Sequence, residues 1–140
     1  MSSPLTLENS LILACVRTEP DVQRIHELVE RCPEWPVIVR KAERWRVVTS
    51  VYLQLRRGAQ SGRVPGPVTQ GLKYLSYRDA IRGDATRELL RAALLRFAEA
   101  SVPVIVLKGG ALATLVYQSH ALRPTRRIEL LVHRRDLRPR

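Results

Sequence analysis

The stretch that decides the fold is VPVIVLKGG, residues 102–110, in which a β-branched, apolar run ends at a lysine and two glycines. A short run of this kind that stops at glycines is typical of a buried β-strand. The residues that follow, 111–118, return to helical character, and a loop is expected through 119–124. A second apolar run, RIELLV at residues 127–132, predicts another strand. Residues 101–140 therefore predict a strand, a helix and a second strand.

The hundred residues before this region predict helices, because their apolar residues recur at three- and four-residue steps. Helices are expected after Thr6 and Pro20 and over 37–57, 68–82 and 86–100. Two points stay open: a turn at Val47-Val48, and whether Gly83-Asp84 interrupts a helix or only weakens it. We therefore expect a mostly helical α+β protein, with a helical region over 1–100 and a strand–helix–strand region over 101–140.

Apolar side chains on the helical stripes are expected to form the core. They include Cys15, Cys32, Trp35 and Trp45 and, on the last long helix, Leu89, Leu90, Ala93, Leu94 and Phe97. Two cysteines are too few for a disulfide scaffold. The sequence holds no uncharged apolar run of about 20 residues, and no basic residue precedes its first apolar stretch. These features predict a soluble, cytoplasmic protein that does not enter a membrane.

The charge of the chain is strongly basic, with 24 Lys and Arg residues against 13 Asp and Glu residues and a net charge of +11. Residues 101–140 hold 8 of these basic residues and 2 of the acidic ones. Arg126, Arg127, Arg134 and Arg135 form a basic cluster that favours either an anionic partner or only a solvated surface. Both interpretations stay open.

The glycine pair after the first strand predicts a site that holds phosphates. Glycines let the backbone approach a ligand closely, and the helix behind them presents free amides and the positive end of its dipole. Gly109 and Gly110 are also compatible with a plain tight turn, and Lys108 with a solvated lysine. Glu129, on the second strand, is either a metal ligand or a surface charge. The three histidines have no metal-ligand spacing.

Five segments together resemble the uncharacterised nucleotidyltransferase family of the polymerase-β-like superfamily: residues 106–113, Tyr117, residues 121–124, residues 128–132 and Asp136-Leu137. The helical region is similar too. The resemblance implies transfer of a nucleoside monophosphate from an NTP to an acceptor hydroxyl, with Mg²⁺ held by acidic residues. The candidate nucleotide-binding residues are then Lys108, Gly109, Gly110, Arg123 and Arg127, and the candidate metal ligand is Glu129.

The sequence departs from the family pattern at the metal site. The acidic pair of the family falls on Arg127 and Glu129, so a fixed positive charge stands where the first carboxylate is expected. Asp136, the only acidic residue after Glu129, matches a helix start and not a ligand. We therefore expect a truncated or degenerate member, a pseudoenzyme that binds NTP and transfers nucleotides poorly or not at all. The alternative is an Arg-rich module that binds nucleic acid or an acidic protein.

Overall fold

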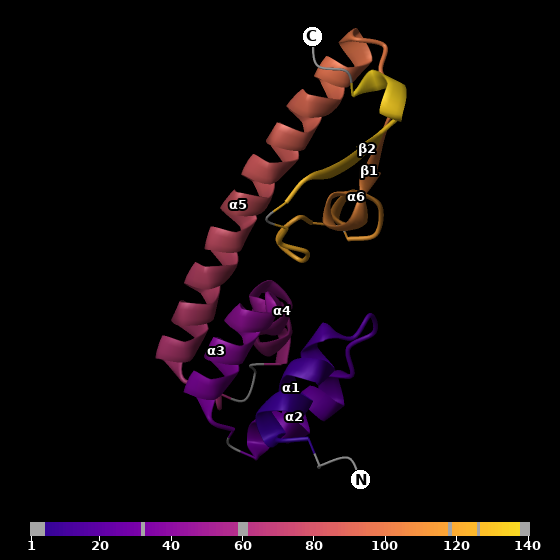
Figure 1. Cartoon of the computed structure of the whole chain (residues 1–140). Coiled ribbons are helices and arrows are strands. Elements are labelled where there is room, and N and C mark those ends of the chain that lie inside the picture. Colours follow the sequence, from indigo (N-terminus) through magenta and orange to yellow (C-terminus); the bar gives the residue numbers. More distant parts are fainter. Residues whose placement is uncertain (1–4, 32, 59–61, 118, 126, 138–140) are drawn as a thin grey trace. The chain divides into compact units, whose positions relative to one another are not determined.

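The structure is a computed structural model that describes all residues except 1–4, 32, 59–61, 118, 126 and 138–140 (Figure 1). Its elements are mostly helices with a small antiparallel sheet, so the prediction of a mostly helical α+β fold is confirmed. The chain groups into two compact units, residues 1–77 and 78–140. Within the described part of the chain, no helix is both long enough and apolar enough to cross a membrane.

The first unit is built from short helices, and side chains cap the starts of the first two. The helices are α1 (Leu7–Val16), α2 (Val22–Glu30), α3 (Trp35–Trp45), α4 (Val48–Gly58) and the first part of α5 (Gly66–Glu99). The hydroxyl of Thr6 accepts a hydrogen bond from the amide of Asn9, and Asp21 caps α2 through the amide of Arg24. A polar side chain before each apolar stripe therefore fixes where these two helices begin.

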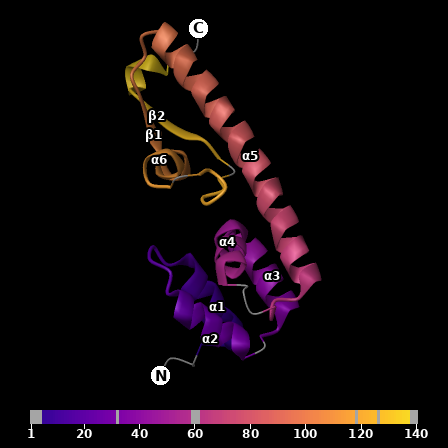
Figure 2. The ribbon, with the colours of Figure 1, turned by 180° about the vertical axis from the view of Figure 1, so that it is seen from behind.

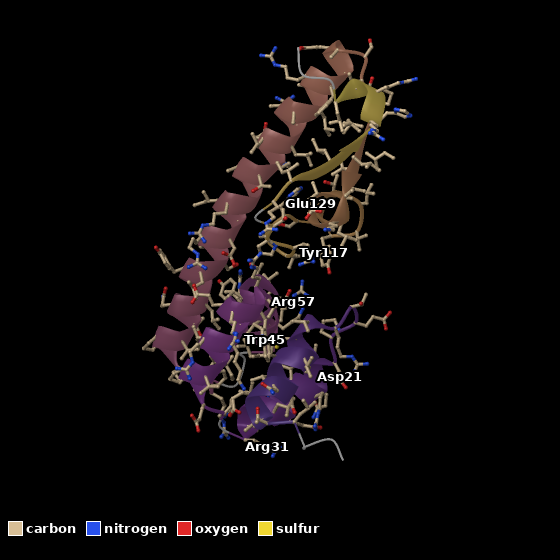
Figure 3. All side chains as sticks on the ribbon, viewed as in Figure 1. Asp21, Arg31, Trp45, Arg57, Tyr117 and Glu129 are labelled. Atoms are coloured by element: carbon tan, nitrogen blue, oxygen red, sulfur yellow. The ribbon has the colours of Figure 1, made fainter. Side chains whose placement is uncertain are left out.

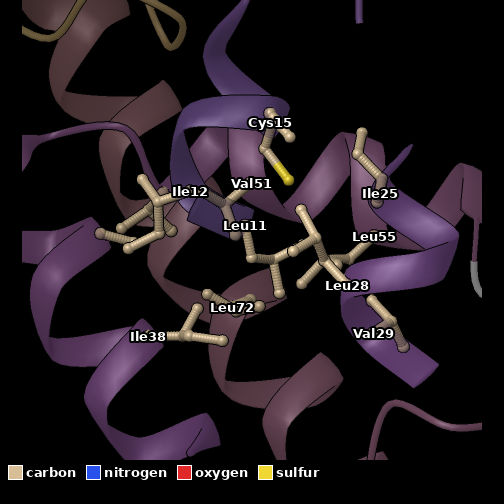
Figure 4. Close-up of a cluster of buried hydrophobic side chains, with 13 residues drawn as sticks. Leu11, Ile12, Cys15, Ile25, Leu28, Val29, Ile38, Val51, Leu55 and Leu72 are labelled. Atoms are coloured by element: carbon tan, nitrogen blue, oxygen red, sulfur yellow. The ribbon is translucent and has the colours of Figure 1, made fainter. Parts of the chain in front are cut away.

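The core of this unit draws apolar side chains from all five helices (Figure 4). Thirteen buried residues form it: Leu11, Ile12, Ala14, Cys15, Ile25, Leu28, Val29, Ile38, Ala42, Val48, Val51, Leu55 and Leu72. Burial raises the pKa of the Cys15 thiol to about 12, because the thiolate loses its hydration. Trp35 packs against this core as predicted, whereas Cys32 lies outside the described residues.

The predicted helix over 37–57 is two helices, because the chain turns between α3 and α4. Arg46 ends α3 in the left-handed conformation with φ 59°, and its amide donates to the carbonyls of Ala42 and Glu43. A turn is thus present where one was considered at Val47-Val48, but it consists of Arg46 and Val47, and Val48 already begins α4. The burial predicted for Trp45 is wrong: its side chain is 46% exposed, on the last residue of α3, where the helix ends at the turn.

Helix α5 runs without a break through Gly83, so this glycine does not interrupt it. Its role is close packing: a Cβ at this position would lie 2.9 Å from the Cβ of His120 and 3.0 Å from its carbonyl carbon. Leu90 is buried on α5 as predicted, but the prediction for Leu89 is wrong, because its side chain is 64% exposed. A helix of this length carries apolar residues on more than one side, and only some of them meet a neighbour.

The second unit places a two-stranded sheet and a short helix on one side of the C-terminal part of α5 (Figure 2). Strand β1 (Val104–Leu107) leads directly into α6 (Lys108–Leu115), and β2 (Glu129–Val132) is followed by a 3₁₀ turn at Arg134–Asp136. The strands are antiparallel, with Leu107 opposite Glu129. Strand β2 begins two residues later than the sequence predicts, and α6 three residues earlier.

Candidate functional site

The turn between β1 and α6 has a strained backbone at Lys108. This residue is the first of α6 and has φ 50°, while Leu107 before it is extended and makes no side-chain cap. The left-handed region costs a non-glycine residue about 1–2 kcal/mol, so the surrounding packing must hold it in place. This backbone conformation sets the direction in which the side chain of Lys108 leaves the turn.

The two glycines of this turn are needed for packing. A Cβ on Gly109 would lie 2.8 Å from the hydroxyl oxygen of Thr125, and a Cβ on Gly110 would lie 3.1 Å from Val106. Leu90 of α5 lies 3.7 Å from that second position. Gly109 therefore lets the start of α6 pack closely on the loop before β2, and Gly110 lets it pack on β1 and α5.

Lys108 and Glu129 meet across the end of the sheet. The register pairs Leu107 with Glu129, so the carboxylate on β2 lies beside the turn into α6 (Figure 3). The Nζ atom of Lys108 is 2.7 Å from Oε2 of Glu129, and the two side chains are 73% and 36% exposed. The structure thus brings the predicted phosphate-binding lysine and the predicted metal ligand into one ion pair.

The two predicted arginines of the site lie in the segment before β2. Arg127 is exposed, and its main-chain carbonyl accepts a hydrogen bond of 2.9 Å from the hydroxyl of Thr125. Arg123 is exposed in the preceding turn. Among the described residues, no ion pair joins either guanidinium to Glu129. Arg126, the other arginine of this part of the basic cluster, lies outside the described residues.

A comparison with protein families decides the relationship that these residues suggest. A family model described as "Uncharacterised nucleotidyltransferase" matches residues 31–139, most of the chain. The chain belongs to this nucleotidyltransferase family. The match includes both strands, α6 and every predicted site residue. No curated protein and no solved structure matches the chain.

The side chains at this turn do not fit the Mg²⁺ ion that a nucleotidyltransferase site implies. Within the described residues, no group of three or more His, Cys, Asp or Glu side chains is placed to hold a metal ion. Mg²⁺ prefers several oxygen ligands, whereas Glu129 is the carboxylate at this turn and is paired with Lys108. The local charge of Lys108, Glu129 and Arg127 is +1, which favours an anion over a cation.

Sequence reasoning missed the residue that organises the loop before β2. The hydroxyl of Thr125 contacts the amide and carbonyl of Arg127 and lies against Gly109. A threonine hydroxyl can bond the backbone two residues on and so form a local turn, which is the signal that Thr125 carried. The packing of His120 on Gly83 carried no signal in the sequence, because it joins segments far apart in the chain.

Proposed function

We propose that this chain is a degenerate nucleotidyltransferase-like protein that binds a nucleoside triphosphate at the β1–α6 turn without a metal ion of its own. Lys108 and Arg127 supply the positive charge, and Arg123 adds to it from the preceding loop. Gly109 and Gly110 keep the turn compact. The protein transfers nucleotides poorly or not at all.

The observation that supports this proposal is the ion pair between Lys108 and Glu129. An exposed pair of this kind contributes only about 0.2–1 kcal/mol, since water and salt screen it. A triphosphate carries several negative charges and offers Lys108 stronger, charge-assisted hydrogen bonds. Bound phosphate therefore displaces Glu129 from Lys108, and the guanidinium of Arg127 offsets the remaining negative charge of that carboxylate.

The charges at the turn also favour binding over transfer. The transfer reaction of the family depends on metal ions that stabilise both the attacking and the leaving oxygen. Arg127 stands at the position of the first expected carboxylate and keeps its charge at every biological pH. A cation there repels Mg²⁺ and attracts phosphate, so the nucleotide is held without the group that activates it.

Calorimetric titration of ATP and GTP into the whole chain, once with Mg²⁺ and once with EDTA, tests the proposal. We expect binding with similar affinity in both buffers. The variant Lys108→Gln should bind at least about tenfold more weakly, since a hydrogen bond to a charged group is worth about 1.5–3 kcal/mol. Lys73→Gln is the matched control, because it removes the same charge from an exposed position on α5.

Two results contradict the proposal. The first is the absence of binding by either nucleotide in both buffers. The second is an equal loss of affinity in Lys108→Gln and Lys73→Gln, which would show that the nucleotide senses only the net charge of the chain.

A further inference from the structure

The sheet of the second unit has one covered face and one open face. Val106, on the covered face, packs on Gly110, and Val104, Leu130 and Val132 share that side by alternation. Ile105 and Leu131 stand directly opposite each other on the other face and are 59% and 52% exposed. Two large apolar side chains therefore form a cross-strand pair that faces solvent.

This open face belongs to a unit that buries little. Among the described residues of the second unit, three apolar side chains are buried: Leu90, Ala113 and Ala121. The core of the first unit has thirteen. The sheet has two strands among the described residues, so each strand has one unpaired edge. A two-stranded ladder is marginal in water, and a third strand or a covering layer stabilises it. Unpaired edges and an exposed apolar pair are the features that another polypeptide uses when it adds a strand.

Positive charge stands at both ends of this sheet. Lys108 and Arg127 lie at the end formed by Leu107 and Glu129, and Arg134 and Arg135 follow Val132 at the opposite end. With Glu129 and Asp136 included, each end carries a net charge of +1. A second copy of this chain, laid on the sheet in either direction, would bring like charges together. The net charge of +11 adds to that repulsion.

We propose that the sheet docks an extended segment of an acidic protein, which adds a strand at an edge and extends the exposed apolar row of Ile105 and Leu131 with apolar side chains of its own. The segment alternates apolar and polar residues over about four positions and carries Asp or Glu on both sides of them, to meet the basic ends of the sheet. Nucleic acid does not fit, since its phosphates gain nothing from an apolar pair. This surface shares Lys108 and Arg127 with the proposed nucleotide site, whereas the Ile105–Leu131 pair and the basic end at Arg134 and Arg135 take no part in nucleotide binding.

Selection from a display library of random peptides, with the whole chain as bait, tests this proposal. We expect enriched peptides to alternate apolar residues and to carry acidic residues on both flanks. The best synthetic peptide should bind the double variant Ile105→Thr, Leu131→Thr at least about tenfold more weakly than the unaltered chain, because two apolar contacts are lost. Ile81→Thr on α5, where the side chain is 70% exposed, is the matched control and should bind normally.

A second variant keeps the test decisive if the double threonine change disturbs the fold. Reversing the charge in Arg134→Glu and Arg135→Glu changes no residue of either strand. It should weaken binding of the peptide about tenfold and reduce the salt dependence of binding. The proposal is overturned if no peptide is enriched, if the enriched peptides lack acidic flanks, or if the strand and control variants bind alike. It is also overturned if light scattering finds a dimer that the threonine variant abolishes, because the occupant is then a second copy.

Discussion

Replacing Gly83 by alanine tests how closely the loop after α6 packs on α5. A Cβ at this position would lie 2.9 Å from the Cβ of His120, about 0.5 Å inside an ordinary contact of 3.4 Å. The nearest atoms include the backbone of His120, which cannot rotate away as a side-chain tip does. Overpacking of this kind costs about 1–3 kcal/mol, against a gain of about 1 kcal/mol for alanine over glycine in a helix.

Gly71 of the same helix supplies the control, because a Cβ there meets nothing within 4 Å. Gly71→Ala should therefore stabilise the helix by about 1 kcal/mol. Since the gain in helix propensity is common to both variants, the difference between them isolates the packing cost of about 1–3 kcal/mol at Gly83.

Amide hydrogen exchange is the suitable assay, since it reports the free energy of opening for each unit separately. In Gly83→Ala, we expect faster exchange at the amides of α5 beside Leu90 and in β1. In Gly71→Ala, exchange in the first turns of α5 should slow. If Gly83→Ala protects α5 as much as Gly71→Ala does, His120 does not lie against this helix and the reasoning is refuted.

Three further changes test other parts of the molecule. In a Cys32→Ser background, Cys15 should react with a thiol reagent at pH 8 about a thousandfold more slowly in the folded than in the unfolded chain. The reason is that burial raises the pKa of the Cys15 thiol from 9.0 to about 12 and so lowers the fraction of thiolate. Equal rates would refute the burial of Cys15. The Glu8 carboxylate has a lowered pKa, owing to a hydrogen bond from its own amide and one of 3.2 Å from the amide of Glu34. Glu8→Gln should therefore lower the free energy of unfolding by about 0.5–1 kcal/mol at pH 7, and urea titrations should show this difference vanish as the pH falls through the lowered pKa, below 4.5. Arg127→Asp exchanges a cation for a second carboxylate beside Glu129. ATP binding measured by calorimetry should then become about tenfold tighter with Mg²⁺ than with EDTA, without nucleotide transfer. Equal affinities in the two buffers would show that residue 127 is not beside the nucleotide.

The sequence predicts the helices of this protein better than their buried faces. Spacing of apolar residues located α1 and α2, because local periodicity and caps decide these features, but it left the break before α4 open. Spacing failed at Trp45 and Leu89. Whether an apolar side chain at a helix end, or on a second side of a helix, is buried depends on which other element packs against it. Leu90 is buried and the adjacent Leu89 is exposed because of tertiary packing, which the spacing of apolar residues does not reveal.

The candidate site shows the same division. The run from β1 into the glycine pair was visible in the sequence, and so was the carboxylate at Glu129. The contact between Lys108 and Glu129 was not, because it depends on the antiparallel register that sets Leu107 opposite Glu129. Positive φ at Lys108 was equally hidden, since lysine is not a residue whose identity signals that conformation.

Helix α5 has a consequence for the order in which this chain folds. The boundary between the two units, at Tyr77 and Arg78, falls inside this one helix. Forming the first turn of a helix costs free energy, whereas each further residue adds a hydrogen bond for a small additional loss of conformational entropy. Once Leu72 joins the first core, residues 66–77 form a finished nucleus on which 78–99 can grow by elongation alone. During synthesis, residues 1–77 are made before residues 78–140. The folded start of α5 in the first unit can therefore nucleate residues 78–99, the longest helical segment of the second unit.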